Sequence, residues 1–77
     1  MSNAWETTPM DIANVLEQHG FDIGYDVDET RLIEICDFQI DHELVEASAL
    51  YGQDMDEQVK FAYEEIASQL KKIGVIE

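Results

Sequence analysis

The clearest hydrophobic pattern lies near the C-terminus, where apolar residues recur at spacings of 4, 3, 4 and 3. The series consists of Val59, Tyr63, Ile66, Leu70 and Ile73. This heptad-like spacing places one apolar stripe along a helix. Asp54 and Glu57 precede it in the arrangement of a capping box, and Gly74 follows it as a stop signal. The pattern predicts a helix over residues 55–73.

A second helical pattern begins at Thr8 and Pro9, which suit the capping position and the first position of a helix. Apolar residues then recur at helical spacing, and Gly20 ends the series. The apolar residues of this series are Ile12, Val15 and Leu16, and His19 follows in the expected last turn. The pattern predicts a helix over residues 9–19.

Residues 21–27 alternate strictly between apolar and polar side chains, which is typical of a strand. The only available partner for such a strand is the segment 31–38. The linking residues 28–30 contain no glycine, although tight hairpin turns favour one. A 21–27/31–38 hairpin in an α+β fold therefore stays open as an alternative.

Asp28 is better placed to cap a helix that runs over 29–38. The apolar residues beyond it do not share one face of a single long helix, so we expect a break near residues 39–41. Asp41 then caps a further helix over 42–51.

The preferred fold is mainly α, a small bundle of about four helices near 9–19, 29–38, 42–51 and 55–73. The chain has 77 residues, which is room for one domain. We expect residues 1–7 to form a flexible N-terminal segment and residues 8–77 to form a single acidic helical domain.

The formal net charge is −14, and its distribution is uneven. Residues 1–59 carry 15 acidic side chains against Arg31, whereas residues 60–77 are balanced. A surface this acidic repels nucleic acid and anionic membranes and attracts basic protein surfaces. Direct binding to nucleic acid or membrane is therefore not expected. The single cysteine, the absence of a secretory signal pattern and the absence of a long apolar run predict a cytoplasmic protein.

The acidic residues after Gly20 do not match a calcium-binding loop. A loop starting at Asp22 has Val27 at the sixth position, where the turn requires glycine. A loop starting at Asp26 has Arg31 there. The stretch is better interpreted as a solvated loop with helix-capping side chains.

Side chains for catalysis or transition-metal binding are few. They are His19, Cys36 and His42, and no two of them stand at ligand spacing. Cys36 on an apolar helix face is most simply a small buried hydrophobe. We expect no catalytic residues, no metal site and no cofactor, and hence no enzymatic activity.

Nine carboxylates lie within 25 residues of the middle segment, where Arg31 is the only basic residue. They are Asp22, Asp26, Asp28, Glu29, Glu34, Asp37, Asp41, Glu43 and Glu46. We expect this set to bind a basic protein surface. In charge and size the chain resembles small acidic nucleic-acid mimics, such as phage anti-restriction and anti-CRISPR inhibitors. That resemblance implies a nucleic-acid-binding enzyme as the most concrete partner.

Phe61 lies well around the last predicted helix from the apolar stripe. A chain this short has little interior for a second aromatic face, so we expect Phe61 at a subunit or partner contact. The alternative function follows from the same helix: a small homodimeric accessory or adaptor protein, whose seam is residues 55–73 and whose acidity only maintains solubility.

Overall fold

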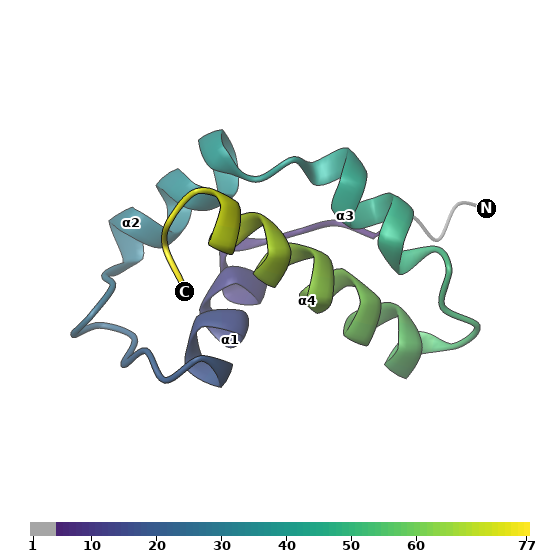
Figure 1. The fold of residues 1–77 in the computed structure, drawn as a ribbon, viewed down its shortest axis with the longest axis horizontal. Helices are drawn as coiled ribbons and strands as arrows, with labels where there is room; N and C mark the ends of the chain where they lie inside the picture. The colour runs from purple at the N-terminus through teal and green to yellow at the C-terminus, as the bar shows by residue number, and fades with distance from the viewer. Residues whose placement is uncertain (1–4) are drawn as a thin grey trace.

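The computed structural model describes residues 5–77. Its helical elements are α1 (Pro9–Gln18), α2 (Glu29–Glu34), η1 (Ile35–Gln39), α3 (His42–Ala49) and α4 (Met55–Lys72) (Figure 1). The π-helical turn η1 continues α2 directly, so the described chain has four helices. All four begin at the predicted residue and end within two residues of the predicted end. The predicted small helical bundle is confirmed.

Side-chain caps define where the helices begin. The carboxylates of Asp28, Asp41 and Asp54 accept hydrogen bonds from backbone amides in the first turns of α2, α3 and α4. At α1, the backbone amide of Thr8 donates to Asp11 Oδ2 over 2.9 Å. Each of these bonds satisfies an amide that has no partner within its own helix. The predicted aspartate caps of α2, α3 and α4 are confirmed, whereas at α1 the Thr8 hydroxyl makes no cap bond to a backbone amide and donates to Asp11 Oδ2 instead.

The second helix ends in a π turn, in which the amide of Ile40 donates to the carbonyl of Ile35. Ile40 itself is extended, with φ −92° and ψ 134°. The carbonyl of Cys36, left free at this helix end, accepts a hydrogen bond from Nε2 of His42. The predicted break before α3 is therefore present, and His42 supplies part of its hydrogen bonding.

The hairpin alternative is wrong: residues 5–77 contain no strand, only an isolated bridge between Ile23 and Val27. The segment instead closes on itself, because Gly24 N donates to Val27 O over 2.7 Å and Asp22 N donates to Asp26 Oδ2 over 2.7 Å. Of the four alternating apolar residues, Phe21, Ile23 and Val27 pack against the core, whereas Tyr25 is exposed. Gly24, at φ +92°, permits the tight turn.

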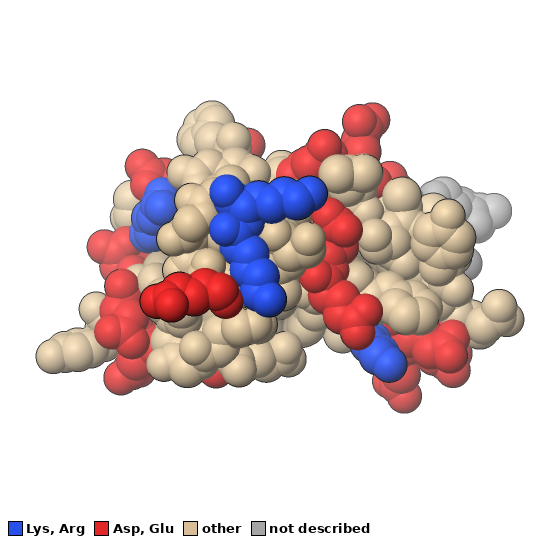
Figure 2. Space-filling view, in the orientation of Figure 1, with Lys and Arg blue, Asp and Glu red and all other residues tan. Residues whose placement is uncertain are grey.

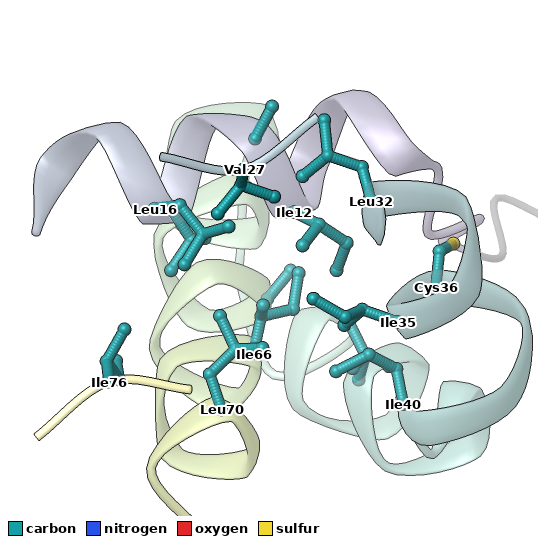
Figure 3. Close-up of a cluster of buried hydrophobic side chains, with 14 of the residues drawn as sticks. Ile12, Leu16, Val27, Leu32, Ile35, Cys36, Ile40, Ile66, Leu70 and Ile76 are labelled. Carbon is teal, nitrogen blue, oxygen red and sulfur yellow. The ribbon is translucent and has the colours of Figure 1, made fainter. Parts of the chain in front are cut away.

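The elements pack around one hydrophobic core. α3 and α1 both pack on α4, and α2 with η1 packs on α1. The result is elongated, with extents of 38 × 21 × 20 Å. Figure 3 shows core side chains from α1, the loop, α2, η1 and α4 pointing toward one another. The largest fully buried ones are Ile12, Leu16, Ile35, Ile66, Leu70, Val15, Val45 and Cys36.

The apolar stripe of α4 differs from the predicted set at its C-terminal end. Ile66 and Leu70 are fully buried, but Ile73 lies beyond the helix and is 39% exposed. Ala62 and Gln69 are buried instead. Their short or polar side chains carry no signal in a pattern of large apolar residues, although both face the core.

Both ends of the described chain pack against the core. Thr7 is buried, and Trp5 meets Tyr63 edge to face with ring centroids 6.4 Å apart. Residues 5–7, which we expected in a flexible N-terminal segment, thus contact the bundle, while residues 1–4 lie outside the described residues. At the other end, Gly74 adopts φ +84° and lets buried Ile76 fold back over α4.

Candidate interaction surfaces

The nine carboxylates of the middle segment, named here the acidic edge, lie on consecutive elements. Figure 1 shows that the loop after α1, and then α2, pass around the left end of the molecule, and that η1 and α3 continue along its upper side. Eight of the nine side chains are exposed and Glu46 is half-buried. The structure therefore leaves the whole predicted set accessible to a partner.

Three members of the acidic edge also have local structural roles. Asp28 and Asp41 cap α2 and α3 through bonds of 2.9 Å to Arg31 N and 3.3 Å to Leu44 N. Asp26 closes the loop by accepting from the amide of Asp22. These carboxylates are exposed and keep their negative charge while they accept hydrogen bonds, so a partner can still contact them. Replacing them would remove those hydrogen bonds and disturb the fold.

The remaining members make little internal contact. Within residues 5–77, the one ion pair joins Arg31 to Glu34 at 3.8 Å, between partly exposed side chains. Such exposed pairs contribute little to stability. The charge of the acidic edge is therefore almost entirely uncompensated by cations of the described chain.

Acidic side chains also occur elsewhere on the surface. Figure 2 shows red side chains along the left edge, over α3 and over α4, and blue side chains over the C-terminal end of α4, at the left edge and at the lower right. Lys71 and Lys72 lie in the last turn of α4, where cations suit the helix dipole. The face seen in Figure 2 thus carries interspersed cations among its acidic side chains.

Exposed aromatic residues interrupt the acidic edge, which the sequence patterns did not indicate. Phe38 in η1 is 84% exposed and Tyr25 in the loop is 87% exposed. Phe38 follows Asp37 directly and lies one turn beyond Glu34. Aromatic side chains of this kind supply much of the binding energy at protein interfaces.

Phe61 lines a second feature, a groove of about 420 Å³ between α3 and α4. The other lining residues are Ser48 from α3, Tyr51 from the turn after it, and Glu64 and Glu65 from α4. Phe61 is half-buried, so it neither enters the core fully nor stands free in solvent. The expectation that it makes a subunit or partner contact stays a prediction.

A wider groove of about 670 Å³ lies between α1 and α4. Its charged lining residues are Asp56, Lys60, Glu64 and Lys71, two of each sign, and His19 stands at its edge. The charges balance, and His19 Nδ1 lies 3.0 Å from the carbonyl of Val15 as an ordinary helix-end contact. This groove shows no preference for a charged ligand.

The residues considered for chemistry do not converge. Cys36 is buried at 2% exposure and 3.7 Å from the carbonyl of Thr7, and burial, followed by the charges of Asp37 and Asp11, raises the pKa of its thiol. In residues 5–77, no group of three or more His, Cys, Asp or Glu side chains is placed to hold a metal ion. Over the same residues, no helix is both long and apolar enough to cross a membrane.

Two polar clusters escaped the sequence patterns. Tyr63 donates its hydroxyl to Asp11 Oδ1 and accepts from Asn14 Nδ2, both over 3.0 Å, which ties α4 to α1. Burial is the main cause that raises the pKa of the Tyr63 phenol. Buried Gln69 binds the backbone of Asp41. Both clusters join elements distant in sequence, so no local pattern indicates them.

Comparison of the chain with known protein families, with curated proteins and with solved structures finds no match.

Proposed function

We propose that this chain is a non-enzymatic interaction protein that binds a basic protein surface through the acidic edge. The observation that carries the proposal is the combination of nine accessible carboxylates on consecutive elements, around one end and along the upper side in Figure 1, with a single exposed ion pair within residues 5–77. Uncompensated charge on this scale attracts basic partners over a distance of about 10 Å and accelerates their association.

A nucleic-acid-binding enzyme is the most concrete partner. Duplex DNA presents one negative charge per about 1.7 Å of its axis, so a stretch as long as the 38 Å molecule presents roughly 20 charges. The chain carries 18 acidic side chains, a comparable total, and nine of them belong to the acidic edge. Mimicry requires carboxylates concentrated on one surface, so the acidic edge is the part that would imitate the nucleic acid. A mimic of this kind would occupy the partner's nucleic-acid site, with Phe38 as an apolar anchor within the acidic edge.

The test compares two triple variants with the same change in net charge. The edge triple is Glu34→Gln, Asp37→Asn and Glu43→Gln, which leaves the capping Asp28 and Asp41 intact. The control triple is Glu6→Gln, Glu17→Gln and Glu77→Gln, all exposed and outside the acidic edge. Wild-type protein first captures partners from its source cells, and each captured protein is then purified and titrated.

The edge triple should weaken binding by about tenfold or more and flatten its salt dependence, while the control triple changes affinity much less. Duplex DNA should compete with the wild-type chain for a nucleic-acid-binding partner. If both triples bind equally well, and roughly 0.5 M salt leaves affinity unchanged, the acidic edge is not the binding surface.

The second candidate is a homodimeric accessory protein in which acidity only maintains solubility. The observation that favours it is the set of exposed apolar residues around the α3–α4 turn, which are Leu44, Leu50, Tyr51 and Met55. Two copies with a charge of −14 each would repel one another, which opposes this arrangement. A dimeric mass by light scattering at low salt, without any basic partner, would favour it over the first proposal.

A further inference from the structure

The α3–α4 groove combines an apolar lining with negative charge. Its floor and wall include the half-buried Phe61 and the 80% exposed Tyr51, while Glu64 and Glu65 are its charged lining residues. No lysine or arginine lines it. Lys60, the neighbour of Phe61 in sequence, lines the α1–α4 groove instead.

The apolar surface continues along α3 beyond the groove itself. Leu44 stands one helical turn before Ser48, on the same side of the helix, and is 49% exposed. Leu44 and Ser48 therefore lie on one side of α3, and Tyr51 follows in the turn after the helix ends at Ala49. α3 has eight residues and is about 12 Å long, so the exposed side chains of Leu44 and Tyr51 lie near its two ends.

The adjacent side of α3 is already used, because Val45 and Ala49 are fully buried and α3 packs on α4. Leu44 and Ser48 each precede one of these residues, so the exposed side lies beside the contact with α4, where the groove is. Leu44 and Tyr51 thus add apolar surface that the fold does not require. Figure 2 shows tan surface over α3 beside a run of red over α4, so an apolar strip adjoins an acidic one on this face.

We propose that the α3–α4 groove receives a basic amphipathic helix from a partner protein. Apolar residues of that helix at i, i+4 and i+7 would contact Phe61, Tyr51 and Leu44, and flanking lysines or arginines would face Glu64 and Glu65. This is the helix-in-groove mode of recognition, with specificity added by charge. The proposal rests on the proposed function and names the segment that the basic partner supplies.

Charge decides between this occupant and a second copy of the chain. In a symmetric pair formed through this groove, the same surface patch lies on both sides of the interface. Glu64 and Glu65 of one molecule would then lie near those of the other, without a cation in the groove lining. Like charges at an interface are unfavourable, whereas a basic helix removes the imbalance.

The probe is a synthetic basic amphipathic peptide of about 14 residues, roughly 21 Å as a helix, with leucines at i, i+4 and i+7 and lysines on the other faces. Two control peptides accompany it: one of identical composition in which the leucines are scattered, and one in which glutamates replace the lysines. Binding to the full chain is measured by calorimetry and mapped by amide chemical shifts.

The basic amphipathic peptide should bind and shift the amides of α3 and of Phe61, while both control peptides bind at least about tenfold more weakly. Tyr51→Ser and Leu44→Ser should each weaken binding by about tenfold. The control is Met10→Ser, which removes an exposed apolar side chain of α1 outside both the groove and the acidic edge and should leave affinity unchanged. Tyr51 and Leu44 are exposed, so replacing either one should leave the fold intact. They therefore test the groove even if the half-buried Phe61 cannot be replaced without unfolding the protein.

Three outcomes would overturn the proposal: equal binding of the scattered peptide, amide shifts confined to the α1–α4 groove, or a dimer in the absence of peptide that Tyr51→Ser dissociates.

The edge triple separates this inference from the proposed function. If the edge triple abolishes capture of the natural partner but groove variants do not, the acidic edge binds and the groove inference fails. If groove variants alone abolish capture, the groove is the binding surface and the proposal for the acidic edge is wrong.

Discussion

The side-chain amide of Gln69 pairs with the backbone of Asp41, although the two residues are 28 positions apart. Gln69 Oε1 accepts from Asp41 N over 2.7 Å, and Gln69 Nε2 donates to Asp41 O over 3.2 Å and to Glu65 Oε2 over 3.0 Å. Gln69 thereby satisfies both backbone groups of the residue that separates η1 from α3. Asp41 in turn caps α3, so α4 fixes the point at which the middle segment changes direction.

Replacing Gln69 should destabilise the protein more than any exposed glutamine does. Gln69→Leu keeps the approximate volume but leaves the amide of Asp41 without its partner, while the carbonyl of Asp41 keeps only its bond from Val45 N. A lost partner of this kind costs about 1–3 kcal/mol. Urea unfolding followed by circular dichroism measures this loss. Gln53→Ala, at an exposed position, is the control and should change stability by less than about 0.5 kcal/mol. A Gln69→Leu variant as stable as the control would show that water replaces the pairing.

The sequence predicted the parts of this fold that short-range chemistry determines. Asp28, Asp41 and Asp54 act within three residues of the amides they cap, so their roles follow from local order. Gln69 acts across 28 residues, and its burial cannot be inferred from a period of apolar residues. The hairpin alternative for residues 21–27 was wrong for a related reason: alternation of apolar and polar residues does not by itself specify a strand.

For the candidate site too, the sequence predicted what depends on local chemistry and missed what depends on tertiary packing. The composition of the acidic edge is visible in the sequence, and its accessibility was expected of carboxylates. The exposure of Phe38 was not expected, because it depends on which side chains the tertiary packing covers, and a large apolar residue in a helical pattern does not indicate this. The α3–α4 groove likewise depends on how two helices pack, which is a tertiary property.

Gly52 stands where the turn after α3 passes close to the start of α4. A Cβ atom added there would lie 2.5 Å from Gln58 N and 2.8 Å from Gln58 Cα, and backbone atoms cannot move aside cheaply. Gly52→Ala should therefore cost about 1–3 kcal/mol of stability, measured by thermal or urea unfolding.

Gly20 provides the contrast, because it has φ +89° and open space around it. Asparagine tolerates such a conformation, so Gly20→Asn should be mild whereas Gly52→Asn should be as damaging as Gly52→Ala. Equal effects of asparagine at both glycines would contradict the steric argument.

Cys36 should make stability depend on pH in the alkaline range. Burial raises the pKa of its thiol in the folded state above the ordinary value of about 8.5. Between the unfolded and folded pKa values the unfolded chain binds fewer protons, so the free energy of unfolding falls as pH rises. The contribution is fully present below the unfolded pKa and is lost as pH rises through the folded one.

Cys36→Ala removes this titration while leaving Tyr63 and the lysines unchanged. Urea unfolding of both proteins between about pH 7.5 and 10 should show a steeper loss of stability in the wild type. The variant should be less stable at every pH because it lacks the buried thiol side chain. The quantity to compare is therefore the slope of the free energy of unfolding against pH. Parallel curves for the two proteins would mean that the thiol ionises as easily in the folded state as in the unfolded one.

Salt should stabilise this protein, because repulsion dominates its electrostatics. The net charge is −14, while the one ion pair in residues 5–77 is the exposed contact between Arg31 and Glu34. Raising ionic strength from about 0.01 M to about 0.15 M shortens the screening distance from roughly 30 Å to roughly 8 Å. The molecule measures 38 × 21 × 20 Å, so repulsion across it is nearly unscreened at the lower value and largely screened at the higher one.

The melting temperature should therefore rise over this range of sodium chloride, and the edge triple, with three charges fewer, should show a smaller rise from a higher starting value. Arg31→Gln is the control, since it removes the ion pair and increases the net charge to −15. If the ion pair contributes as little as exposed pairs do, this variant should retain or slightly enlarge the salt effect. A melting temperature that falls with salt would mean that attractive contacts outweigh the repulsion, and the uncompensated charge assigned to the acidic edge would then have to be reconsidered.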